Sequence, residues 1–142
     1  MLKNSLMRGV MVLAVAACGL MWAHSAAIAQ QPPAVKRTVL LQHDLTIPGF
    51  EAVLVQGDLP VGSREGRHTH PGSAMVHVLE GAITLDYEGQ PSKTYKVGES
   101  FFIEGGKVHE GINKGNVPIK TIITFVIPKG ATLTTQVTTT TK

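Results

Sequence analysis

The chain has 142 residues and a formal net charge of +3, and 43% of its residues are hydrophobic. It contains no run of lysine or arginine that would form a basic patch, which argues against a nucleic-acid partner. A single cysteine, Cys18, excludes an intramolecular disulfide, so packing alone must stabilise the fold.

The first 29 residues have the layout of a secretory signal peptide. Lys3 and Arg8 precede an uncharged stretch of 15 residues, Gly9 to Ala23, and Ala27-Ile28-Ala29 offers a cleavage site of the A-x-A type. That stretch is shorter than the roughly 20 residues that a membrane-spanning helix needs. We therefore expect cleavage near Ala29 and a periplasmic or secreted protein without a membrane span. The remaining chain would carry 11 basic and 10 acidic residues, a net charge of +1.

Cys18 leaves a second interpretation of the leader open. Val15-Ala16-Ala17-Cys18 has the form of a bacterial lipoprotein cleavage site, which would anchor the protein through a lipid on the cysteine. The apolar stretch continues from Gly19 to Ala23, however, where a lipoprotein normally begins a polar tether. We favour soluble export over this alternative.

Residues 30–142 are predicted to form one all-β domain with a core at about 39–127. After a polar lead-in at Gln30 to Lys36, short β-branched and aromatic runs alternate with glycine and proline. Turn signals recur about every 8–12 residues, as in β-sandwiches and barrels. No segment shows helical periodicity over ten residues. The expected strands include Val39–Leu41, Ala52–Val55, Met75–Leu79, Ala82–Tyr87, Thr94–Val97, Ser100–Ile103 and Ile119–Ile127.

Three of the five histidines in this domain form a candidate metal site. His68 and His70 are two residues apart, so on a strand both side chains point to the same face. Pro71-Gly72 then turns the chain, and His109 can supply a third imidazole from a distant strand. Three imidazoles suit a divalent transition ion rather than magnesium or calcium. His77 and His43 lack such spacing and are interpreted as a surface or interface residue and a structural residue.

The spacing around these histidines resembles that of the cupins. Gly62-x5-His68-x-His70-x3-Ala74-x6-Gly81 matches the first cupin motif, G-x5-H-x-H-x3-E-x6-G, except at Ala74. Gly98-x5-Glu104-x-Gly106-x2-His109-x3-Asn113 matches the second, G-x5-P-x-G-x2-H-x3-N, except at Glu104. The chain thus resembles a small single-domain cupin of the conserved-barrel type, similar to quercetin-dioxygenase-like cupins.

The resemblance implies a double-stranded β-helix, or jelly-roll barrel, with one metal ion held by His68, His70 and His109. The ion would be iron, zinc, nickel, manganese or copper. The family's fourth ligand is a glutamate, and Ala74 in its position cannot coordinate an ion. The resemblance also implies a homodimer that pairs through an outer sheet face, with Thr38 to Leu45 as the crossing strand.

We looked for a carboxylate that could replace the missing ligand. Glu80 lies six residues after Ala74 and is out of reach, while strand alternation turns Glu110 away from His109. Glu65 lies three residues before His68, so the same alternation excludes it. Glu104, in the turn after Ser100–Ile103, is the one acid retained, as a candidate ligand or catalytic acid.

Three hypotheses of function remain open at this stage, one of them a structural β-barrel that associates with a partner protein. The first is a metal-dependent enzyme acting on a small, anionic organic molecule, with dioxygenase-like chemistry preferred over isomerase or lyase chemistry. The second is a non-catalytic periplasmic cupin that binds or senses a metal or a small molecule. A barrel of this kind hosts many activities, so the fold alone does not decide whether the protein is an enzyme.

Overall fold

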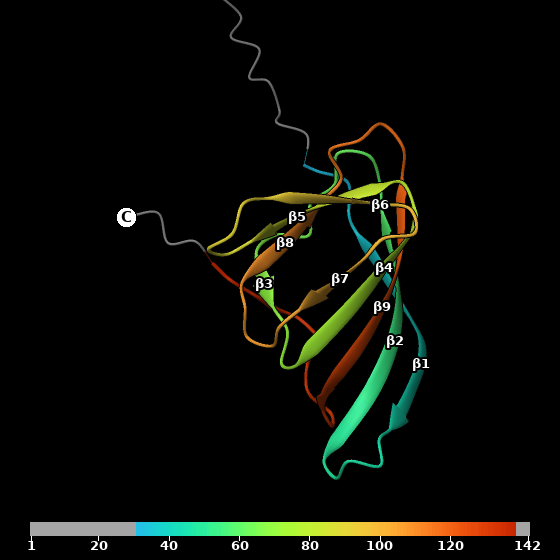
Figure 1. The fold of residues 1–142 in the computed structure, drawn as a ribbon, viewed down its shortest axis with the longest axis vertical. Helices are drawn as coiled ribbons and strands as arrows, with labels where there is room; N and C mark the ends of the chain where they lie inside the picture. Colours follow the sequence, from blue (N-terminus) through green and yellow to red (C-terminus); the bar gives the residue numbers. More distant parts are fainter. Residues whose placement is uncertain (1–30, 139–142) are drawn as a thin grey trace, which may run out of the picture.

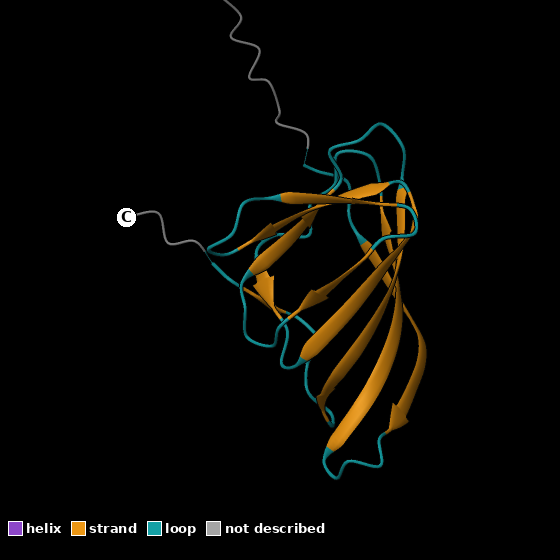
Figure 2. Cartoon of the chain, viewed as in Figure 1, coloured by secondary structure: helices purple, strands orange, loops and turns teal. Residues whose placement is uncertain are grey.

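The computed structural model describes residues 31–138, which form ten β-strands in two antiparallel sheets (Figures 1 and 2). The leader, with its cleavage site and Cys18, lies outside the described residues. In the described part of the chain, no helix is long and apolar enough to cross a membrane. The strands are β1 (Lys36–Asp44), β2 (Phe50–Leu59), β3 (His68–Thr69), β4 (Ser73–Glu80), β5 (Ala82–Tyr87), β6 (Lys93–Lys96), β7 (Ser100–Ile103), β8 (His109–Ile112), β9 (Ile119–Pro128) and β10 (Thr135–Gln136).

The strand order is that of a jelly roll, in which consecutive strands alternate between the sheets from β2 to β5 and from β6 to β10. The larger sheet has the order β1-β2-β9-β4-β7 and the smaller one the order β10-β3-β8-β5-β6. Long strands of the larger sheet form one wall, and the short strands that carry the histidines face them (Figure 1). This arrangement confirms the predicted all-β jelly-roll fold.

Strict alternation along the long strands builds the core between the sheets. In β2 and β9 every second residue is buried, because successive side chains point to opposite faces of a sheet. The inward residues are mostly valine, isoleucine, leucine and phenylalanine, and Leu59, Ile119, Phe125 and Ile127 are almost completely buried. Each fully buried aliphatic or aromatic side chain contributes roughly 1.5–3 kcal/mol. The core therefore accounts for stability without a disulfide.

Asn113 fastens the loops at one end of the barrel. Its side-chain amide donates hydrogen bonds to the carbonyl oxygens of Leu59, Pro60 and Val117, at 3.0, 3.1 and 2.9 Å. Its side-chain oxygen accepts a hydrogen bond from the Gly115 amide at 3.0 Å. The buried asparagine thus joins the end of β2 to the loop before β9.

The outer face of the larger sheet carries an apolar row that crosses all five strands. The register places Leu41 beside Leu54, Leu54 beside Thr124, Thr124 beside Met75, and Met75 beside Phe102. Leu41, Met75 and Phe102 are 59%, 44% and 54% exposed. An antiparallel sheet that faces water normally carries polar residues on that side, and a contiguous apolar patch marks an association surface.

We therefore expect the protein to be a homodimer in solution, as the sequence predicted. Leu41→Lys should weaken the dimer, because a charge would be buried in the apolar row. Val97→Lys is the control, since Val97 is equally exposed at 59% but lies in the turn after β6. Light scattering at micromolar concentration measures the mass. A native monomer, or equal dissociation in both variants, would contradict the prediction.

Candidate metal site

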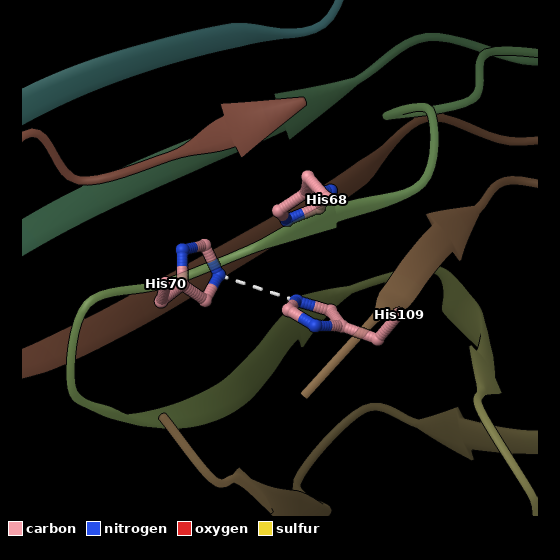
Figure 3. A group of neighbouring side chains, drawn as sticks. All are labelled: His68, His70 and His109. Carbon is pink, nitrogen blue, oxygen red and sulfur yellow. Dashed lines mark hydrogen bonds between the residues drawn. The ribbon is translucent and has the colours of Figure 1, made fainter. Parts of the chain in front are cut away.

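The smaller sheet brings the three predicted histidines together inside the barrel. His68 in β3 pairs directly with His109 in β8, and His70 follows the end of β3. The Gly106 amide donates a hydrogen bond to the His70 carbonyl oxygen at 2.9 Å, which holds the loop before β8 against the end of β3. All three side chains are buried, at 1%, 5% and 1% exposure, and their rings converge (Figure 3).

Backbone carbonyls orient all three imidazoles in the same way. The Nδ1 atom of His68 donates to the Gly66 oxygen at 2.7 Å, and that of His109 donates to the Lys107 oxygen at 2.9 Å. The Nδ1 atom of His70 donates to the Leu133 oxygen at 2.6 Å, from the segment before β10. A carbonyl can only accept, so each Nδ1 carries the proton and each Nε2 presents a lone pair. Such bonds are the usual outer support of a metal-binding histidine.

Burial keeps these imidazoles neutral. It lowers the pKa of His68 and of His109, and it lowers the pKa of His70 to about 4. The positive charge of Arg37 lowers the pKa of each of the three further. Neutral imidazole is the form that binds a metal ion, so the site is ready to bind at neutral pH.

The nitrogen atoms at the centre fit a cation. The Nε2 atoms of His70 and His109 lie 3.2 Å apart (Figure 3), yet both are acceptors when both Nδ1 atoms carry protons. Two lone pairs facing each other in a buried site are unfavourable unless a cation lies between them. One ligand atom from each histidine lies within 4.8 Å of the others, so small movements of the rings would bring all three nitrogens to about 2.1 Å from a shared ion. His68, His70 and His109 could therefore hold one transition-metal ion.

A small cavity of about 20 Å³ adjoins the three histidines, which is roughly the space that one water molecule needs. Its walls are mainly apolar side chains of both sheets, with Arg37 and Glu65 as the charged residues. The remaining lining residues are Leu59, Val76, Ile83, Leu85, Phe101, Ile103, Gly111, Thr121, Ile123 and Phe125.

Ala74 points into the barrel from β4. It is completely buried and pairs with Ile103 on β7 and with Phe125 on β9. The Phe125 ring packs edge to face against the His70 ring, with centroids 4.8 Å apart. Position 74 thus lies beside a residue whose ring contacts a metal-site histidine, although Ala74 itself is not among the residues that line the cavity.

Glu110, Glu80, His77 and His43 lie outside the histidine cavity. Glu110 turns away from His109 to pair with Arg64, whose hydrogen bonds hold the pKa of that carboxyl below its usual range. Glu80 is exposed and pairs with Lys120. His77 is exposed on the outer face of β4 and hydrogen-bonds the Ser100 hydroxyl, and His43 is exposed on β1.

Glu104 is exposed in the turn after β7 and is not among the residues that line the histidine cavity. It lines a second pocket together with Tyr87 and Lys93, and its backbone amide donates to the Tyr87 hydroxyl at 3.4 Å. Its assignment as a catalytic acid stays a prediction.

Glu65 is not among the residues that could hold the ion, but it lines the histidine cavity, where strand alternation had not placed it. The exclusion assumed one regular strand from Glu65 to His68. Gly66 between them has a φ of +74°, and β3 begins only at His68. The alternation of side-chain directions along a strand therefore does not apply between Glu65 and His68. The signal that could have located Glu65 is this glycine, because a glycine permits a positive φ that interrupts strand alternation immediately before the H-x-H motif.

The structure thus places three buried histidines that could hold a metal ion inside a jelly-roll barrel, as the motif spacing predicted. The sequence matches the cupin domain family over residues 56–127, so the chain belongs to the cupins. A comparison with curated proteins finds no match.

Solved structures support the fold. A cupin-like protein from Thermotoga maritima is 18% identical with a TM-score of 0.62, and the match covers 76% of this chain and 79% of that one. A protein with a double-stranded β-helix domain from Klebsiella pneumoniae is 21% identical with a TM-score of 0.58, over 72% and 84%. DMSP lyase DddQ from Ruegeria pomeroyi is 19% identical with a TM-score of 0.55, over 60% of this chain but only 42% of that one.

The lowered histidine pKa values predict how pH affects the metal-free protein. The unfolded chain takes up protons as the pH falls through about 6.5, whereas folded His70 stays neutral down to about pH 4. Stability should therefore decline over this interval, by up to about 1.4 kcal/mol per pH unit for each such histidine. Urea unfolding of the native protein and of His70→Gln, in EDTA and at several pH values across this interval, measures the effect. If the free energy of unfolding changed with pH equally steeply in the native protein and in the variant, the prediction would be contradicted.

Proposed function

We propose that the protein is an exported metal-binding cupin that acts on a small, anionic organic molecule, with dioxygenase-like chemistry preferred. The observation that supports this most directly is the convergence of three neutral Nε2 atoms on a buried apolar cavity. His68, His70 and His109 would hold the ion through these atoms. When bound, the ion would act as a Lewis acid or, if it is iron, allow reaction with dioxygen.

The charge of the site favours anionic ligands. Three neutral imidazoles leave the two positive charges of a divalent ion uncompensated, and the ligand cluster contains no carboxylate. The apolar walls exclude water and strengthen this attraction. Carboxylates, enolates and catecholates are therefore the classes that we expect to bind.

The small cavity supports a second candidate, a non-catalytic cupin that binds or senses a metal or a small molecule. Its free volume of about 20 Å³ admits little more than a water molecule, so a larger substrate requires side chains to move.

Metal analysis followed by oxygen uptake distinguishes the candidates. Protein produced from Gln30 onward should contain about one divalent transition ion per chain, as expected for one three-histidine site. Oxygen uptake with a panel of catechols and β-dicarbonyls would support the dioxygenase. Bound metal without turnover of any compound in the panel would favour the binding protein. Absence of metal binding would overturn the proposed dioxygenase and leave only a cupin that binds a small molecule.

A further inference from the structure

The histidine cavity opens to solvent beside one ion pair, Arg37 with Glu65. Every other residue of the cavity lining is buried, whereas Arg37 and Glu65 are intermediate, with side chains 28% and 11% exposed. A ligand that reaches the histidines through this opening must pass the pair. These two residues also supply the only formal charges in the lining.

Arg37 reaches the cavity because of its place on β1. It pairs with Gly57 on β2, a buried position between the inward residues Val55 and Leu59. Directly paired residues project from the same face of a sheet, so Arg37 points inward. Gly57 presents no side chain there, and a Cβ atom at this position would lie 2.6 Å from the Thr121 hydroxyl.

Glu65 is held from two sides. One carboxylate oxygen accepts a hydrogen bond from Arg37 Nη2 at 2.7 Å, and the other accepts one from the Gly111 amide at 3.1 Å. The Glu65 amide in turn donates to the Gly111 carbonyl oxygen at 3.0 Å. A side chain at position 111 would collide with the carboxylate, so glycine permits this close approach.

The guanidinium keeps donors for another anion. Within residues 31–138, Glu65 is its only side-chain partner, and that bond uses one of five N–H groups. If a ligand carboxylate replaced Glu65 on Arg37, the Glu65 carboxylate would retain its bond to Gly111. One carboxylate would replace another on Arg37, so Glu65 competes with the ligand for the guanidinium.

We infer that Arg37 is the anion-recognition residue of this site and that Glu65 occupies it until an anionic ligand binds. The inference rests on the proposed function, and it narrows the ligand to one with two anionic groups. One group would bind the metal ion, and the second would bind Arg37 at the opening. A guanidinium suits this role because it stays charged and binds carboxylates through paired donors.

The probe pair is malonate and its monoamide, malonamate, which have similar size but differ by one carboxylate. Both are titrated into Co²⁺-loaded protein, followed by the cobalt absorption spectrum, and into metal-free protein, followed by calorimetry. In the native protein malonate should bind roughly tenfold or more tightly than malonamate, the usual effect of a hydrogen bond to a charged group. Arg37→Gln should bring this ratio close to one, and Arg37→Lys should give an intermediate ratio.

Glu65→Gln should raise malonate affinity, because the competing carboxylate is gone. Arg67→Gln is the matched control, since Arg67 has similar exposure and pairs with Asp86 and Glu88 outside the cavity. An unchanged ratio in Arg37→Gln, with Co²⁺ still bound, would overturn the inference and leave the proposed function standing. Absence of Co²⁺ binding in the native protein would overturn the proposed function, and the calorimetric series would then decide the role of Arg37 separately.

Discussion

His109→Ala should lose metal binding, and His68→Ala should do the same. Each of these histidines supplies one of three Nε2 atoms, so the ion would keep two protein ligands. Loss of an outer partner of a metal ligand already costs 10–100-fold in affinity, and loss of the ligand itself should cost more than about a hundredfold. Metal content after dialysis against a weak chelator gives the result for both variants.

His77→Ala is the matched control for these variants. His77 is exposed on the outer face of β4 and hydrogen-bonds Ser100, so its removal should leave the metal content unchanged. The histidine variants should also remain folded, which circular dichroism checks, because their apolar core is intact. Full metal occupancy in the His68 or His109 variant would show that the ion binds elsewhere.

The fold could be predicted from local patterns because three of the long strands repeat them. Alternating apolar residues in β2, β4 and β9 specify which face is buried, and glycine or proline ends each run. The polar segment before the first strand was expected to extend to Lys36. Strand β1 instead begins at Lys36, because this residue already pairs with Asp58 on β2. Neighbouring strands in the sheet, rather than local composition, decide such a boundary.

The candidate site could be predicted only in part. The spacing of His68, His70 and His109 was sufficient to predict the histidine cluster. The H-x-H pair shares one face of a strand, and the second motif supplies the third histidine. Arg37 could not be found in this way, because its place at the cavity depends on the register of β1 against Gly57. Glu65 was excluded by an alternation rule that the positive φ of Gly66 invalidates. Residue spacing alone does not predict contacts that depend on strand register or on a glycine with positive φ.

Ala74→Glu should make the stability of the protein depend strongly on metal. Position 74 is fully buried among apolar side chains beside Phe125. A carboxylate there lacks compensation in the metal-free protein, and burial of an unpaired charge costs on the order of several kcal/mol. The bound ion would offset this cost by pairing with the carboxylate. Thermal unfolding with and without metal should therefore show a larger difference for the variant than for the native protein.

The same substitution should move two affinities in opposite directions. We place Ala74 at the position of the family's metal-binding glutamate, so the new carboxylate would add a fourth protein ligand and raise metal affinity. It would also occupy a coordination position and repel anions, so an anionic chelator should bind the metal-loaded variant more weakly. Ala74→Gln, similar in size but uncharged, should produce neither effect at comparable strength. Titrations of metal into metal-free protein, and of the chelator into metal-loaded protein, measure both affinities. If both affinities rise, or neither changes, residue 74 does not face the ion, and the first motif has been aligned wrongly.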